Sequence, residues 1–298
     1  FFFKQKTAYE IVDCDWSSDV CSSDLTPAGD GGEEFLRCRT IDGGKARPAG
    51  ADQRHRHAPA VAARGEGAGA VDGIGNPQGL GFEPGGAVYA FQLDTGHLTP
   101  RPWVNVLANA GFGTLATDNG AGHTWAGNSR MHQLTPWRND PLRDQPGEWL
   151  LLHDPARGTV RALGAALAPG VQRRVRHGIG FSELTERWDG LEVVLRTSVD
   201  PTAAIKQVAV TVRRLDGGPP RRLRLLALLE WQMGAGYGER IGVHTQPWRV
   251  PPVSGWRAST ALLATQQEAL HGFGGATAAV AWRCDGDDGA VRLDPQAW

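Results

Sequence analysis

The sequence lacks the features of a disulfide-rich, nucleic-acid-binding or membrane-spanning protein. Only four of its 298 residues are cysteine, and two of these, Cys14 and Cys21, fall within the first 25 residues. The other two, Cys38 and Cys284, are far apart and give no basis for a disulfide framework or a zinc site. The formal net charge is −1 and no run of about 18 apolar residues occurs, so neither a nucleic-acid partner nor a membrane span is predicted.

Residues 1–25 contain two strings that match translated sequencing-adapter DNA, KQKTAYE at 4–10 and DWSSDVCSSDL at 15–25. A signal peptide is a poor alternative, because three phenylalanines precede the basic residues and no apolar core follows them. We therefore predict that residues 1–25 are an artefact that packs on nothing.

Residues 26–78 are poor in large apolar side chains and show neither a period of 2 nor one of 3.6. The string RHRH at 54–57 could ligate a metal or contact a phosphate. The composition around it is more typical of a disordered linker or of GC-rich DNA translated out of frame. We expect residues 26–78 to be disordered or out of frame, with no metal site.

From residue 79 onward, short apolar or alternating runs are separated by turn residues at fairly regular intervals. This pattern is typical of antiparallel β-sandwiches. The 11 tryptophans suit either a β core or surfaces on which sugars stack. The sequence therefore predicts an all-β fold, an antiparallel sandwich over residues 79–298.

Two hairpins are predicted within this sandwich. Residues 175–188 meet residues 191–199 across Asp189-Gly190, a two-residue turn that favours positive φ. Residues 205–215 and 221–231 flank the string GGPP, which predicts a second hairpin of the same kind. The apolar run LRLLALLEW in the last of these segments could also be a buried helix, and its neighbours favour a strand.

The segment 102–141 has the composition of a binding site. Tryptophans, asparagines, Ser129, Arg130 and Asp140 lie among glycines that allow tight loops. Aromatic faces pack on sugar C–H surfaces, and Asn, Asp and Arg side chains can hydrogen-bond sugar hydroxyls. In the alternative interpretation the tryptophans belong to the core and the Asn and Asp residues form turns and caps.

Four strings carry a family resemblance: PWVNVLANAGFG, TWAGNSR, LTPWRNDP and RRVRHGIG. Over residues 79–282 the sequence resembles the cyclic β-1,2-glucan synthase branch of glycoside hydrolase family 94. The resemblance implies an antiparallel β-supersandwich of the galactose-mutarotase type, followed by an (α/α)6 barrel whose aspartate acts as general acid in an inverting reaction. We expect this chain to stop before that barrel and to be inactive in phosphorolysis by itself.

The site residues expected to face a sugar or the barrel interface come from the same central segment: Trp125, Asn128, Ser129, Arg130, Trp137, Asn139 and Asp140. An interface role without sugar contact is equally compatible with the pattern. No cofactor is expected beyond inorganic phosphate as a co-substrate of the full-length enzyme.

None of the carboxylates in the sandwich is predicted to be a general acid. Asp118 and Asp140 lie in turn strings, Glu148 and Glu183 lack a convincing carboxylate partner, and Glu230 is expected to pair with an arginine such as Arg224. An epimerase mechanism would use a histidine and a glutamate, with His123, His177 and His244 available. Their spacing gives this no support, and core or loop histidines are the simpler interpretation.

Three functional hypotheses follow. The first is a carbohydrate-binding accessory sandwich of a β-glucan phosphorylase or synthase, with a β-glucan or oligosaccharide and the catalytic barrel as partners. The second is a stand-alone carbohydrate-binding protein, and the third a structural or oligomerising sandwich, which leaves a homodimer open. The family resemblance implies a cytoplasmic location, with tethering to the inner membrane through other parts of a longer chain.

Overall fold

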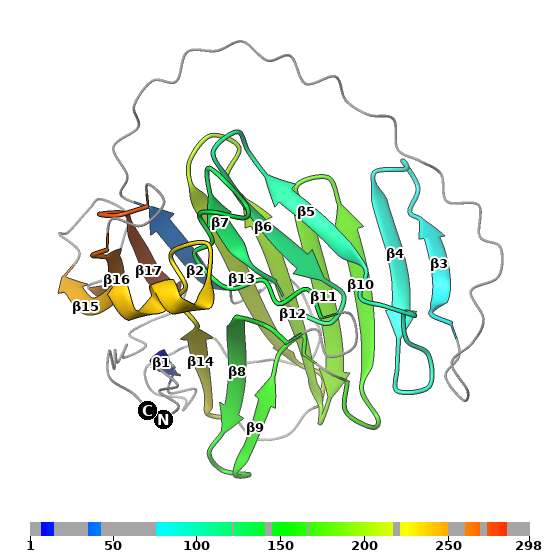
Figure 1. The fold of residues 1–298 in the computed structure, drawn as a ribbon. Helices are drawn as coiled ribbons and strands as arrows, with labels where there is room; N and C mark the ends of the chain where they lie inside the picture. Colours follow the sequence, from blue (N-terminus) through cyan, green and yellow to red (C-terminus); the bar gives the residue numbers. More distant parts are fainter. Residues whose placement is uncertain are drawn as a thin grey trace.

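The computed structural model shows an all-β protein in which every strand pair is antiparallel (Figure 1). Apart from one 3₁₀ turn, η1 (Tyr237–Gly242), the described residues contain no helix. The expected all-β supersandwich class is therefore confirmed. The structure describes residues 7–14, 35–42, 76–120, 122–140, 145–165, 167–216, 221–249, 260–268 and 273–284.

The strands form three sheets. The ten-stranded sheet has the order β15-β16-β17-β2-β13-β12-β11-β10-β4-β3, the four-stranded sheet β1-β14-β8-β9, and the three-stranded sheet β5-β6-β7. The strand bounds are β1 (Thr7–Cys14), β2 (Phe35–Asp42), β3 (Gln78–Phe82), β4 (Val88–Leu93), β5 (Val104–Ala108), β6 (Phe112–Thr117), β7 (Thr124–Ala126), β8 (Glu148–Asp154), β9 (Thr159–Ala162), β10 (Gln172–Gly178), β11 (Phe181–Trp188), β12 (Leu191–Val199), β13 (Ile205–Arg214), β14 (Leu223–Leu229), β15 (Val243–Arg249), β16 (Thr260–Gln266) and β17 (Thr277–Cys284).

The hairpins β10–β11–β12–β13 form the middle of the large sheet, and Figure 1 shows the three-stranded sheet lying across them. The predicted turn at Asp189-Gly190 is confirmed, because both residues have positive φ, 52° and 73°. Alternation places Arg173 and Val175 of β10 in the interior, while Arg174 lies at the surface. The core therefore fills the space between the large sheet and the two smaller ones.

Three apolar clusters make up this core. One lies between β4, β10 and β11 and includes Phe91 and Val175. The second joins β12 and β13 to β8 and β14. The third contains Trp231 and Trp282, so two of the tryptophans are core residues, as the structural interpretation expected.

The second predicted hairpin is wrong. Residues 223–229 form the strand expected of them, but β14 pairs with β8 in the four-stranded sheet and not with β13. The physical reason is that β13 is already paired along both edges, with β12 and with β2, so it has no free edge whose backbone groups could hydrogen-bond another strand. The chain must therefore cross to the facing layer.

Two strands lie in segments that were expected to take no part in the fold. Strand β1 pairs with β14, and β2 lies between β13 and β17. This differs from the expectation that residues 1–25 pack on nothing and that residues 26–78 are disordered. Strand edges pair through backbone groups that every sequence carries, so an open edge accepts an extended segment whatever its origin. The adapter origin of residues 1–25 thus remains a prediction, and RHRH at 54–57 lies outside the described residues.

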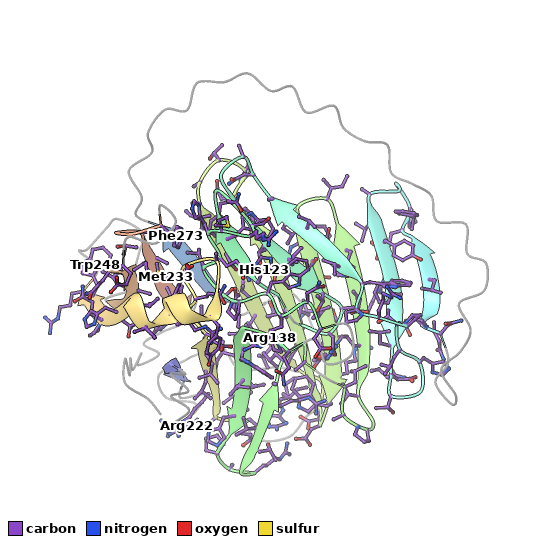
Figure 2. All side chains as sticks on the ribbon, in the orientation of Figure 1. His123, Arg138, Arg222, Met233, Trp248 and Phe273 are labelled. Atoms are coloured by element: carbon purple, nitrogen blue, oxygen red, sulfur yellow. The ribbon has the colours of Figure 1, made fainter. Side chains whose placement is uncertain are left out.

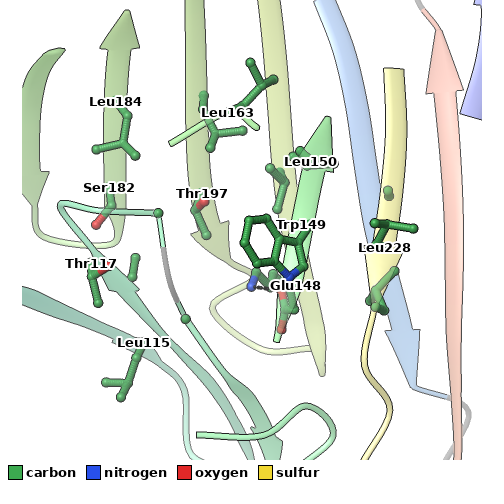
Figure 3. A pocket seen from close by; sticks show the side chains of 18 of the residues that line it. Leu115, Thr117, Glu148, Trp149, Leu150, Leu163, Ser182, Leu184, Thr197 and Leu228 are labelled. Carbon is green, nitrogen blue, oxygen red and sulfur yellow. Dashed lines mark hydrogen bonds and ion pairs between the residues drawn. The ribbon is translucent and has the colours of Figure 1, made fainter. Parts of the chain in front are cut away.

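One buried ion pair connects all three sheets. The Lys206 ammonium of β13 lies 2.5 Å from Oε2 of Glu148, on β8 of the four-stranded sheet. It also donates to the hydroxyls of Thr114 (3.1 Å) and Thr124 (3.3 Å), which belong to β6 and β7. Glu148 Oε1 accepts hydrogen bonds from Thr124 (2.6 Å) and Thr135 (2.7 Å). Figure 3 shows Glu148 among the side chains that line a pocket between the layers.

The charge state of this pair follows from its surroundings. Burial by itself raises the pKa of Glu148, but the Lys206 charge and the hydrogen bonds from Lys206, Thr124 and Thr135 outweigh burial and lower it. Glu148 is therefore anionic at neutral pH. A buried pair of this kind stabilises the fold only while both partners are present.

We predict that Lys206→Met lowers the free energy of unfolding by about 3–5 kcal/mol, because it leaves a buried carboxylate without its partner. Replacing both residues, Lys206→Met with Glu148→Met, should recover most of that loss. Urea unfolding followed by circular dichroism measures both effects.

The control is Arg174→Met, which removes an exposed partner of Glu83, a carboxylate that keeps Arg176 as its second partner, and should cost less than about 1 kcal/mol. A Lys206→Met variant as stable as this control would show that the pair does not hold the sheets together.

Candidate functional site

Three aromatic rings form a stack next to the three-stranded sheet. His123, only 1% exposed, lies between Trp125 of β7 and Trp137 of the following loop. Its ring centroid is 5.0 Å from that of Trp125 and 5.4 Å from that of Trp137, and the planes of His123 and Trp137 differ by only 6°. Trp137 is 51% exposed, so one face rests on a buried support while much of the ring meets solvent.

The support beneath Trp137 is fixed by local geometry. Trp125 packs on Gly113 of β6, where an added Cβ would lie 2.3 Å from the indole Cζ2, so only glycine fits there. The backbone N–H of Trp137 donates a hydrogen bond to Oε1 of the buried Gln133 (3.2 Å). The exposed Trp137 ring is called the platform below. Its ring stacks on His123, and its backbone N–H is hydrogen-bonded to Gln133.

A hollow of about 290 Å³ adjoins the platform. Trp137, Asn139 and Asp140 line one part of it, and Arg101 and Arg138 supply positive charge. Asn139 has φ 47°, a left-handed conformation that asparagine tolerates well and that shapes this loop. An exposed indole can stack on the C–H face of a sugar ring, and amide, carboxylate and guanidinium groups beside it can hydrogen-bond hydroxyls.

Arg138 is held in place by Glu230, which follows β14. Its guanidinium donates to Glu230 Oε2, and Arg240 donates to Glu230 Oε1. Burial raises the pKa of Glu230, but the hydrogen bonds and charges of the two arginines outweigh burial and lower it below its usual range. The prediction that Glu230 pairs with an arginine is confirmed, although the partners are Arg138 and Arg240 and not Arg224. Figure 2 shows Arg138 and His123 in the same central part of the molecule.

The structure separates the predicted site residues into two groups. Trp137, Asn139 and Asp140 line the hollow, whereas the loop carrying Asn128, Ser129 and Arg130 does not. Asn128 Oδ1 accepts hydrogen bonds from the backbone N–H of Arg130 and Met131, both at 2.9 Å, so it caps its own turn. Ser129 and Arg130 are exposed, and Trp125 lies behind the platform.

The asparagines of the string PWVNVLANAG are structural. Asn105 donates from Nδ2 to the carbonyl oxygens of Gly178 (3.0 Å) and Phe181 (2.9 Å), which tie β5 to the β10–β11 turn. Asn109 donates in the same way to Asp200 (2.9 Å) and Ala203 (2.8 Å). Both amides therefore fasten the three-stranded sheet to hairpin ends of the large sheet.

Arg173 of the string RRVRHGIG is likewise structural, because its buried guanidinium connects separate segments of the chain by hydrogen bonds. Only 2% exposed, it donates from Nε to Glu186 Oε1 (2.8 Å) and from Nη1 to the carbonyl oxygen of Asp118 (2.8 Å). A third donor contacts the carbonyl oxygen of Ala165. One buried guanidinium thus holds two loops against the large sheet.

The remaining carboxylates have structural partners. Asp118 accepts hydrogen bonds from the Thr99 hydroxyl (2.7 Å) and from the backbone N–H of Trp103 (3.2 Å), so its carboxylate holds the segment that precedes β5. Its capping of its own turn stays a prediction. Glu183 accepts from Arg176 (2.7 Å) and from Arg196 (3.0 Å). Within the described parts of the chain, no group of three or more His, Cys, Asp and Glu side chains could hold a metal ion.

Sequence reasoning overlooked several residues of the site. Arg101 and Arg138 line the hollow, and His123 supports the platform, although it was regarded only as a core or loop histidine. Arg138 directly follows Trp137 in LTPWRNDP, and this adjacency was a usable signal. No signal connects His123 to Trp137 across the 13 intervening residues, because ring stacking depends on the tertiary fold.

The three antiparallel sheets packed face to face define the class of β-supersandwich domains. Residues 87–282 match the family model of the glycosyl hydrolase 94 supersandwich domain, and the chain belongs to this family. The resemblance stated from the sequence strings is thereby confirmed.

The similar curated proteins are all larger. The chain is 38% identical over 156 residues to a cyclic beta-(1,2)-glucan synthase of Rhizobium meliloti, covering 52% of this chain and 6% of the synthase. N,N'-diacetylchitobiose phosphorylases are also similar: that of Vibrio proteolyticus is 25% identical over 96 residues and that of Vibrio furnissii 26% over 113. These alignments cover 31% and 37% of this chain, and 12% and 14% of the phosphorylases. No helix among the described residues is long and apolar enough to cross a bilayer.

Two buried histidines give the fold a pH dependence. Burial lowers the pKa of His123, and that of His177, from 6.5 to about 4. The unfolded chain therefore binds protons between pH 6.5 and 4 that the folded chain excludes. The free energy of unfolding should decrease as the pH falls through this window, by up to about 3 kcal/mol for each histidine.

We predict that His123→Phe, which keeps an aromatic ring between the two indoles but cannot be protonated, removes about half of this loss. Urea unfolding at a series of pH values from 7 to 4 measures it. His244→Gln, at an exposed position of β15, is the control and should behave as the parent chain does. If the free energy of unfolding of His123→Phe falls with pH as steeply as that of the parent chain, the His123 ring does not titrate between pH 6.5 and 4.

Proposed function

We propose that this chain is the carbohydrate-contacting supersandwich of a larger β-glucan-active enzyme, an inverting glycosidic phosphorylase or a cyclic β-1,2-glucan synthase. The observation that carries the proposal is the Trp137 ring, stacked on His123 and exposed beside a polar hollow. An aromatic ring fixed in this way can accept a sugar ring at little cost in side-chain entropy.

Catalysis belongs to a separate (α/α)6 barrel in this proposal. Its support within the sandwich is that Glu148 and Glu230 have lowered pKa values and are therefore anions, which cannot donate a proton to a glycosidic oxygen at neutral pH. Inorganic phosphate would be the co-substrate if the enzyme is a phosphorylase. The sandwich would then contribute glucan contacts close to the barrel.

The setting of the whole enzyme is part of the same proposal. The similarity to a cyclic glucan synthase supports a cytoplasmic module tethered to the inner membrane through other parts of the longer protein. A homodimer is a further expected partner. The exposed loop with Ser129 and Arg130, which does not line the hollow, is available for the barrel or for a second copy.

We predict that soluble β-1,2-glucan changes the tryptophan fluorescence of the chain, and that Trp137→Ala weakens glucan binding at least about tenfold, or roughly 1.4 kcal/mol. The matched control is Trp248→Ala, because Trp248 is 43% exposed and lies well away from His123 in Figure 2. This control should bind glucan as the parent chain does.

Equal binding by Trp137→Ala and Trp248→Ala would contradict the platform. If the parent chain shows no fluorescence change at millimolar glucan, the stand-alone binding hypothesis fails. In that case a lower melting temperature of Trp137→Ala would favour the structural or oligomerising sandwich instead.

A further inference from the structure

A second hollow, of about 540 Å³, lies between the β8–β9 hairpin and the β11–β12 turn. It shares no lining residue with the hollow beside Trp137. Its polar wall consists of Asp154, Asp189, Arg161 and Arg221, and its aromatic wall is Trp188. None of these side chains has a role in the proposed glucan contacts.

Three of the four charged residues in this wall, Arg221, Asp154 and Asp189, are hydrogen-bonded to one another. Arg221 donates from Nη2 to Asp154 Oδ2 (2.7 Å) and to Asp189 Oδ2 (3.0 Å), and from Nη1 to the Asp189 carbonyl oxygen (2.7 Å). Arg157 at the hairpin turn also donates to Asp189. Both carboxylates are therefore neutralised by their own arginines.

Arg161 of β9 is the exception. Its closest carboxylate oxygen is Glu186 Oε2, 3.9 Å from Nε, and Glu186 already accepts hydrogen bonds from Arg173. Among the described residues Arg161 has no hydrogen-bond partner, and its Nε is buried without one. With 24% of the side chain exposed, the remaining guanidinium N–H groups are available to a molecule in the hollow.

The electrostatic balance also favours an anion. Glu186 is paired with Arg173 at 2.6 Å, and Asp154 and Asp189 are paired with Arg221, so no carboxylate within hydrogen-bonding distance compensates the Arg161 charge. Burial, followed by the neighbouring Arg173 charge, lowers the pKa of Arg161, although Glu186 works in the opposite direction. A bound anion would compensate both unfavourable effects.

A neutral sugar is the weaker candidate here, because the Arg161 guanidinium covers one face of the Trp188 ring. The Arg161 guanidinium carbon lies 4.6 Å above its ring centroid, and the indole also packs against the apolar cluster of Leu191 and Leu223. The contact with Trp188 holds the guanidinium at the wall of the hollow, and guanidinium N–H groups are donors suited to an oxyanion.

We propose that this second hollow binds a small phosphate-type oxyanion, free or as the phosphoryl group of a sugar phosphate, through the Arg161 guanidinium. The assignment is independent of the proposed glucan contacts at Trp137. The hollow is large enough for the sugar part of such a ligand beside Arg161, with Asp154 and Asp189 as acceptors for its hydroxyls.

The test titrates the full chain with inorganic phosphate and, separately, with glucose 6-phosphate, at constant ionic strength set with chloride and with glucose as the neutral control. Isothermal calorimetry should detect binding of a phosphate ligand, and Arg161→Met should weaken it at least about tenfold. Arg161→Lys keeps the positive charge but loses the paired N–H donors of the guanidinium, so its affinity should lie between those of the parent chain and Arg161→Met. Arg174→Met is the control, because Arg174 is an exposed arginine that does not line the hollow, and it should bind as the parent chain does.

The two ligands distinguish the source of the oxyanion. Equal affinities indicate that the site reads the phosphate alone, and tighter binding of glucose 6-phosphate indicates that it holds the sugar as well. The proposal is overturned if neither ligand binds, or if Arg161→Met binds as tightly as the parent chain while keeping its melting temperature in chloride.

Discussion

The contact between Lys206 and Glu148 is the constraint on which the arrangement of the three sheets depends. A lysine on the large sheet and a glutamate on the four-stranded sheet face each other at 2.5 Å, and threonines of the three-stranded sheet complete their hydrogen bonds. Buried charges are costly unless they are paired and hydrogen-bonded. A shift of one sheet relative to the others would break these contacts, so the polar centre favours the observed placement of the layers.

The candidate carbohydrate site inherits its geometry from that centre. Thr124, which donates to Glu148, is the first residue of β7, and His123 and Trp125 lie on either side of it. Thr135, the other hydroxyl on Glu148, lies two residues before Trp137. The two segments that meet in the aromatic stack are thus anchored on the same carboxylate, and the exposed indole is positioned by a buried ion pair behind it.

Several residues of the strings that carry the family resemblance form hydrogen bonds that connect the sheets and loops. Asn105 and Asn109 each use a side-chain amide to hold the ends of hairpins, and Arg173 holds two loops through backbone carbonyl oxygens. Such hydrogen bonds need a particular donor at a particular place, because a buried carbonyl oxygen without a partner is costly. The residues that make a sequence recognisable are therefore partly distinct from those that offer a surface to a ligand.

The sequence by itself determined the all-β class, the Asp189-Gly190 hairpin and the family. It also predicted a site within residues 102–141, and Trp137, Asn139 and Asp140 of this segment line the hollow. These depend on local turn chemistry, period-2 alternation and short strings, which the order of residues contains. Only the tertiary structure decided that β14 leaves β13 for the facing sheet, that Asn128 caps a turn while Trp137 forms a platform, and that His123 supports it. Partners distant in sequence meet only after the layers pack, and neither composition nor spacing encodes which of them will touch.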